Sequence, residues 1–160
     1  MIDLPRAVPT ALSRAQLFLE VVEDFTFLQT LTWNAEAGKW TIKFRVSLPE
    51  AEESCLLNFS EWYLTVDENY PFGRIDIFPS KENGIIGTYP HQRYNDEGKT
   101  ALPWRAGNIC VNTQAKVVGR HGYDTEPHSP DERLKWHCQR AVEWIRSASK
   151  GELVLPGEPF

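Results

Sequence analysis

The 160 residues have the length and composition of one globular domain, because 41% of them are hydrophobic and 24% charged, and this excludes a disordered chain. Seventeen Lys and Arg against 22 Asp and Glu give a formal net charge of -5, which argues against nucleic acid as the main partner. No apolar run of about 18 residues could span a membrane, and the N-terminus has no secretory signal pattern, so we expect a cytoplasmic protein.

The first half of the chain predicts one helix followed by strands. Apolar side chains at helical spacing predict an amphipathic helix that begins near Thr10 and Ser13, ends near Asp24 and buries Ala11, Ala15, Phe18, Leu19 and Val22. Residues 40–48 alternate apolar and polar side chains, as a strand with one buried face does. Residues 27–33 predict its hairpin partner, and two further strands are expected around residues 62–66 and 75–77. Connections this short favour antiparallel pairing, so we expect a four-stranded antiparallel meander.

The second half predicts a long irregular segment and one more helix. From Pro79 to about Pro127 the periodic pattern gives way to Gly, Pro, Asn and His, and loops this long inside a compact domain are usually functional. A helix is predicted over residues 129–150, with Ser129 as N-cap, Pro130 in the first helical position and Glu132 completing a capping box. The result is a single α+β domain spanning residues 1–160.

The same order of elements carries motifs of a known family: Tyr70-Pro71-Phe72, Ile75-Asp76-Ile77-Phe78-Pro79, His91, Asn95 and Gly107-Asn108-Ile109-Cys110-Val111. The chain resembles the ubiquitin-conjugating enzymes, in which a Tyr-Pro turn joins strands three and four and a Gly-x-Ile-Cys segment carries the active cysteine. The resemblance covers nearly the whole chain. It implies a ubiquitin-conjugating-enzyme-like fold with an N-terminal helix, the meander, a long active-site loop and a C-terminal helix.

The C-terminal part narrows the resemblance through Trp144-Ile145-Arg146, Ala148-Ser149, Gly151-Glu152-Leu153-Val154 and Pro156-Gly157-Glu158-Pro159-Phe160. These residues resemble the bacterial conjugating-enzyme-like proteins of CBASS antiphage operons. The resemblance implies a cGAS-like nucleotidyltransferase as partner, whose C-terminus is charged onto the cysteine. It also implies an activating-enzyme domain, in cis or in trans, and leaves open whether the chain is complete or a piece of a fusion. No cofactor or metal ion is expected.

Cys110 is the candidate nucleophile, because a thiolate forms an acyl ester that keeps most of its transfer potential. The alternative for any free cysteine is a small buried hydrophobe, and we expect this of Cys55 and Cys138. No C-x-x-C pair is present, so neither a disulfide framework nor a zinc knuckle is indicated.

His91 and Asn95 are the other candidate catalytic residues, as a proton acceptor and as an amide donor to the oxyanion. Both could instead serve loop architecture. In the family a contiguous His-Pro-Asn stands closer to the cysteine, so which of the two acts stays open. His121 and His128 could line the site, Trp104-Arg105 could clamp a peptide tail or anchor the loop, and Asp124 or Asp131 could orient an attacking lysine.

Two other classes of protein fit some of these residues. A cysteine protease would use Cys110 with a histidine and an amide or carboxylate, although the strands-first order and the Gly-Asn-Ile-Cys context argue against it. A non-catalytic binding module on the same fold is the second alternative, and the presence of the cysteine argues against it.

Overall fold

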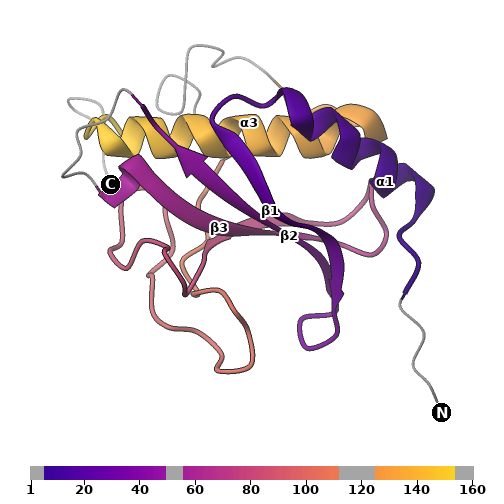
Figure 1. Cartoon of the computed structure of the whole chain (residues 1–160), viewed down its shortest axis with the longest axis horizontal. Helices are drawn as coiled ribbons and strands as arrows, with labels where there is room; N and C mark the ends of the chain where they lie inside the picture. Colours follow the sequence, from indigo (N-terminus) through magenta and orange to yellow (C-terminus); the bar gives the residue numbers. More distant parts are fainter. Residues whose placement is uncertain (1–5, 50–55, 112–124, 154–160) are drawn as a thin grey trace.

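The computed structural model describes residues 6–49, 56–111 and 125–153 of the chain. In chain order, the elements are helix α1 (Thr10–Leu17), the 3₁₀ turn η1 (Phe18–Val21), strands β1 (Phe25–Asn34) and β2 (Lys39–Ser47), the 3₁₀ turn η2 (Leu56–Asn58), strands β3 (Phe59–Val66) and β4 (Ile75–Pro79), and helix α3 (Pro130–Ser149). Figure 1 labels both helices and the first three strands. None of the helices in these described parts is long and apolar enough to cross a membrane.

The four strands form one antiparallel sheet in the order β1-β2-β3-β4, so the predicted meander is confirmed. The register sets Ile42 opposite Leu64 and Leu64 opposite Ile77, which gathers the apolar side chains of neighbouring strands on one face. In the turn between β1 and β2, the Oδ1 of Asn34 accepts a hydrogen bond from the Ala37 N–H at 2.9 Å. Gly38 follows with φ +63°, a backbone conformation that residues with a side chain rarely adopt.

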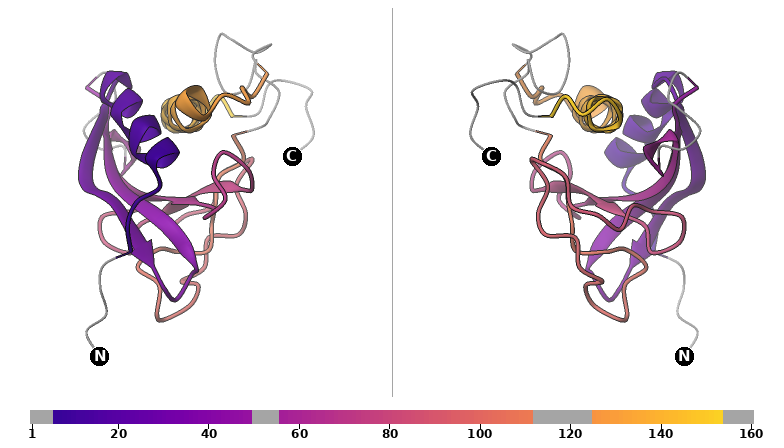
Figure 2. Two further views of the ribbon diagram at one scale, coloured as in Figure 1. Left: turned by 90° about the vertical axis from the view of Figure 1, so that its right-hand side faces the viewer. Right: turned by 90° about the vertical axis from the view of Figure 1, so that its left-hand side faces the viewer.

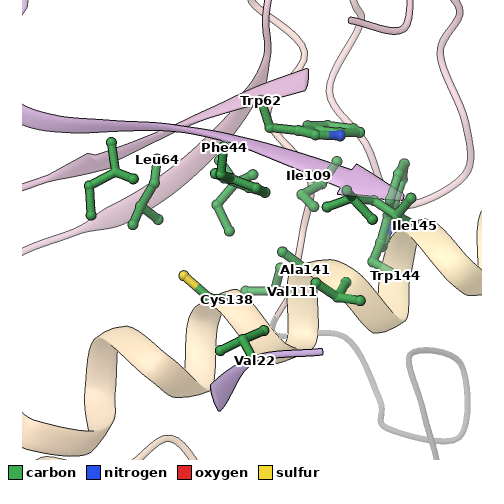
Figure 3. Packing of buried hydrophobic residues seen from close by; sticks show 14 of the residues in the cluster. Val22, Phe44, Trp62, Leu64, Ile109, Val111, Cys138, Ala141, Trp144 and Ile145 are labelled. Carbon is green, nitrogen blue, oxygen red and sulfur yellow. The ribbon is translucent and has the colours of Figure 1, made fainter. Parts of the chain in front are cut away.

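Helix α3 lies along the apolar face of the sheet with α1 beside it (Figures 1 and 2). Trp62 of β3 and Trp144 of α3 meet edge to face with their ring centroids 6.2 Å apart. Figure 3 shows Cys138 and Ala141 of α3 in the same buried cluster, facing the strands. Burying one large apolar side chain contributes about 1.5–3 kcal/mol, so this helix-to-sheet contact is a main source of stability.

Residues 80–111 cover part of the opposite face of the sheet and contain no helix or strand, as the sequence predicts. Tyr63 and Phe78 alternate with core residues and therefore point to this face. Trp104 packs against both, with ring centroids 5.5 Å and 5.7 Å away. The Glu61 N–H donates to the carbonyl oxygen of Asn83 at 3.0 Å, so the segment is also tied to β3 by its backbone.

The prediction of which side chains the first helix buries is wrong in part. Leu12, Ala15, Leu19 and Val22 are buried, but Phe18 is 40% exposed. The buried residues are spaced three and four apart, so they form one helical stripe, and Phe18 lies at the edge of this stripe. Pro9 occupies the N-cap position of α1.

The expected capping box of the second helix is also wrong. Pro130 does occupy the first helical position, but the Ser129 side chain makes no capping hydrogen bond. Instead the Ser129 carbonyl oxygen accepts from the N–H groups of Glu132 and Arg133 at 3.1 Å and 3.0 Å. The helix ends before Gly151, whose φ of +70° fits the predicted stop.

Tyr70 fixes the start of α3 to the turn that follows β3. Its hydroxyl donates to the Pro130 carbonyl oxygen and accepts from the Leu134 N–H at 3.1 Å. Burial raises the pKa of Tyr70 to about 12, so the hydroxyl keeps its proton. The neighbouring Pro71 carbonyl oxygen accepts from Nη1 of Arg133 at 2.9 Å.

We predict that Tyr70→Phe lowers the free energy of unfolding by about 1–3 kcal/mol, because both hydroxyl hydrogen bonds at the start of α3 are lost. Urea denaturation followed by tryptophan fluorescence measures this change. The matched control is Tyr94→Phe, since Tyr94 is 77% exposed and its hydroxyl lies in water. Equal losses in the two variants would contradict the assigned role of Tyr70.

Candidate active site around Cys110

Cys110 is exposed, yet the backbone on both sides of it is fixed. Ile109 and Val111 are buried in the core. The Ile109 N–H donates to the Ile77 carbonyl oxygen of β4 at 3.0 Å, and the Val111 carbonyl oxygen accepts from Nε of Arg140 on α3 at 2.6 Å. The thiol therefore projects from a short segment held between the sheet edge and the helix.

A short antiparallel ladder brings His91 next to Cys110. Gln92 pairs with Ile109, the Cys110 N–H donates to the His91 carbonyl oxygen at 2.8 Å, and the Arg93 N–H donates to the Asn108 carbonyl oxygen at 3.0 Å. His91 has φ +60°, unusual for a residue with a side chain, and its ring borders the same groove as Cys110. Its Nε2 is buried without a hydrogen-bond partner in the described part of the chain.

Asn95 is buried and uses its amide to hold the loop together. Nδ2 donates to the carbonyl oxygens of Ile85 and Gly87 at 2.8 Å and 3.0 Å, which accounts for both amide hydrogens. Oδ1 accepts from Nε of Arg105 at 3.2 Å. Gly107 lies so close that a Cβ there would stand 2.6 Å from the Asn95 Cβ, which explains a glycine at this position.

An open groove of about 740 Å³ runs beside Cys110. One wall is the ladder of residues 91–93 and 108–111, and another is residues 73–76 at the start of β4. Glu126, Arg133 and His137 also line the groove. Cys110 is exposed and borders this groove.

Glu126, Arg133 and His137 form a charged cluster that the sequence did not reveal. Oε1 of Glu126 lies 2.5 Å from Nε of Arg133 and 2.8 Å from Nε2 of His137. His137 occupies the buried face of α3, where a histidine is easily read as core. The four-residue spacing of Arg133 and His137, one helical turn apart, was the available signal.

The pKa values in this cluster follow from burial and pairing. Burial lowers the pKa of His137 and outweighs the Glu126 carboxylate, which acts to raise it. Partial burial acts to raise the pKa of Glu126, but hydrogen bonds from His137 and Arg133 outweigh it and lower that pKa. The arrangement at neutral pH is therefore an ionised carboxylate that accepts from a neutral imidazole.

A curated protein matches the chain through most of its length. It is the ATP-dependent ubiquitin transferase-like protein Cap2 of Enterobacter hormaechei subsp. hoffmannii (strain UCI 50), which is 31% identical over 127 residues, or 79% of this chain. A match of 127 residues within 160 necessarily includes the stretch that holds Cys110. The chain belongs to the bacterial ubiquitin-conjugating-enzyme-like proteins.

The matched region is 21% of Cap2, so this ubiquitin-conjugating-like domain spans about a fifth of that relative's length. No protein-family model matches the chain. The α+β meander with one helix before it and one after it agrees with the fold expected from the resemblance.

The ubiquitin-conjugating-like domain places the remaining candidates away from the groove or outside the described residues. Trp104 and Arg105 anchor the loop, Trp104 on Phe78 and Arg105 on Asn95. Asp131 pairs with Arg14 of α1 at 3.0 Å, and His128 is exposed without bordering the groove. Cys138 is buried, as expected, and burial raises the pKa of its thiol strongly. Cys55, His121 and Asp124 lie outside the described residues.

We predict that Asn95→Asp destabilises the domain by about 1–3 kcal/mol, because it removes two buried donors and sets carboxylate oxygens against the Ile85 and Gly87 carbonyls. Chemical denaturation measures the change. Asn34→Asp is the matched control, since Asn34 acts as an acceptor for the Ala37 N–H and aspartate keeps that bond. An Asn95→Asp variant as stable as Asn34→Asp would show that the amide does not hold the loop.

We also predict that stability falls as the pH drops from about 7.5 to 5.5. In the unfolded chain, residue 137 binds a proton below the ordinary histidine pKa of about 6.5. In the folded protein the pKa of His137 is lower, so the imidazole stays neutral to a lower pH. The unfolded state therefore binds more protons in this pH range and is favoured as the pH falls. Glu126 titrates below this window because its pKa is lowered. The nearby Asp76 carboxylate acts to raise the pKa of His137, and the nearby Arg133 guanidinium acts to lower it.

Urea denaturation at several pH values measures this slope. His137→Gln should flatten it, whereas His128→Gln should leave it unchanged because His128 is exposed. An unchanged slope in His137→Gln would contradict the role given to the buried imidazole.

Proposed function

We propose that this ubiquitin-conjugating-like domain carries the C-terminus of a partner protein as a thioester on Cys110 and transfers it to an amine. The observation that supports this most directly is an exposed thiol on a backbone held at both neighbours, opening onto a groove of about 740 Å³. A fixed nucleophile beside an open groove suits acyl transfer, because the incoming carbonyl can be held near the sulfur without reordering the chain.

The proposed reaction is acyl exchange in two steps. The Cys110 thiol gives its proton to water, and its sulfur attacks an activated carboxyl carbon. A C–S bond forms and the activating group leaves with its bond electrons. An acceptor amine then attacks the same carbon, the C–N bond forms, and the thiolate departs. The proton lost by the amine ends on the sulfur or in water, so the products are an amide and a free thiol.

Of the two candidates His91 and Asn95, we propose that His91 acts at the reacting centre. Its backbone pairs with that of Cys110 and its ring borders the groove. We assign Asn95 to holding the loop that carries His91, because both of its amide hydrogens already bind carbonyl oxygens.

The resemblance to CBASS proteins supports a cGAS-like nucleotidyltransferase as the charged partner and antiphage defence as the setting. The relative Cap2 is described as ATP-dependent, and this domain spans only about a fifth of its length. We therefore assign activation of the carboxyl group to an adenylating domain, fused or separate, and the whole reaction to the cytoplasm.

We predict a thiol-reducible adduct on Cys110 when the chain is incubated with a cGAS-like nucleotidyltransferase, an adenylating enzyme and ATP. Intact-mass and peptide mass spectrometry locate the adduct. Cys110→Ala should abolish it with little change in stability, since exposed substitutions usually shift the free energy of unfolding by less than about 0.5 kcal/mol. Cys110→Lys should trap a stable amide that survives thiol treatment.

Cys138→Ala is the control, because a thiol buried in the core has no access to the donor. An adduct that persists in Cys110→Ala would refute the assignment. Absence of any adduct on the wild type would favour a non-catalytic binding module, and hydrolysis of peptides would favour a cysteine protease.

A further inference from the structure

The ladder beside Cys110 sorts side chains onto two faces. Side chains next to a bridged pair point to the other face, so Arg93, Asn108 and Cys110 share the face opposite to that of Gln92 and Ile109. Burial agrees with this alternation: Ile109 lies in the core, and the Gln92 amide binds the Gly107 carbonyl oxygen at 2.9 Å. Arg93 and Cys110 are thus on the groove side together.

The register also sets how far Arg93 is from the thiol. His91 lies opposite Cys110 and Arg93 lies opposite Asn108, so Arg93 and Cys110 are diagonal neighbours. Diagonal neighbours in an antiparallel ladder stand about 7–8 Å apart, within reach of a long side chain. The Arg93 guanidinium can therefore reach an acyl group attached to the sulfur.

Arg93 differs from the two other arginines that border the groove. Nη2 of Arg74 pairs with Oδ1 of Asp76 at 3.0 Å, and Nε of Arg133 pairs with Oε1 of Glu126 at 2.5 Å. In the described part of the chain no side chain or carbonyl binds the guanidinium of Arg93, which is exposed. Its donors are available to a substrate.

Acyl transfer creates a need for such a donor. When the amine attacks the thioester, the carbonyl π electrons move to oxygen and form an oxyanion, which collapses as the C–S bond breaks. Asn95, the amide expected to stabilise it, spends both amide hydrogens on the Ile85 and Gly87 carbonyls. The site therefore needs another donor on the Cys110 face of the ladder.

We propose that Arg93 is a catalytic residue that donates a guanidinium N–H to the oxyanion formed from the Cys110 thioester. The proposal rests on the proposed function. Arg93 gains or loses no covalent bond; it stabilises charge that appears on the carbonyl oxygen during attack and disappears when the thiolate leaves. Its planar fork of donors suits an oxygen anion better than the point charge of a lysine.

The experiment separates charging from transfer. The 160-residue chain is charged with a short peptide supplied as a mercaptoethanesulfonate thioester, which requires no activating enzyme, and excess thiol is removed. Free lysine is then added, and loss of the peptide from Cys110 is followed by intact-mass spectrometry under single-turnover conditions. Charging passes through an oxyanion on the same carbon, so Arg93→Ala should charge more slowly but reach the wild-type extent of charging. Once charged, it should transfer to lysine at least about tenfold more slowly, a smaller loss than the 10²–10³ of an enclosed oxyanion hole.

Two further variants define the result. Arg93→Lys keeps the charge and should recover part of the rate. Lys99→Ala removes one exposed positive charge outside the groove and should transfer at the wild-type rate, which excludes an effect of net charge.

Transfer by Arg93→Ala at the wild-type rate overturns the proposal, as does a defect confined to charging, which would place Arg93 in donor binding. Both results leave the carrier function of Cys110 intact. Failure of the wild type to take up the peptide at Cys110 overturns the proposed function, and the proposal about Arg93 with it.

Discussion

The attachment of residues 104–111 to the outer edge of β4 determines where the exposed Cys110 thiol lies. The Arg105 and Ile109 N–H groups donate to the carbonyl oxygens of Pro79 and Ile77 at 2.8 Å and 3.0 Å, so a segment without regular structure still satisfies the edge of the sheet. Ile109 then enters the core. An exposed cysteine follows one residue later, with its backbone held by the same interactions that complete the fold.

Helix α3 serves both the core and the groove. Its apolar side packs on the sheet through residues such as Trp144 and Ile145, while Arg133 and His137 line the groove with Glu126. Tyr70 holds the start of the helix against the turn before β4. Because one helix does both, core packing positions the residues of α3 that line the groove.

Most charged groups that line the groove are paired. Arg74 pairs with Asp76, and Arg133 pairs with Glu126. Compensated groups add little net attraction for a substrate, whereas an unpaired cation beside the thiol acts on the carbonyl oxygen that becomes negative during transfer. For this reason we propose a catalytic role for Arg93 and not for Arg74 or Arg133, which are paired.

The sequence by itself determined the fold class and the candidate for the reactive residue, because both rest on local patterns. Alternating side chains from Trp40 to Leu48 require a half-buried strand, short connections require antiparallel neighbours, and the Gly-x-Ile-Cys context marks Cys110. The tertiary structure decided the rest of the site. Contacts between distant segments consume the Asn95 amide, bring Arg93 onto the face of Cys110 and join Glu126 to His137, and no local pattern encodes such contacts. Phe18 and Ser129 show the same limit. Packing against the rest of the protein decides which edge of the helical stripe is buried, and the Ser129 carbonyl oxygen accepts the Glu132 N–H that the expected cap would have bound.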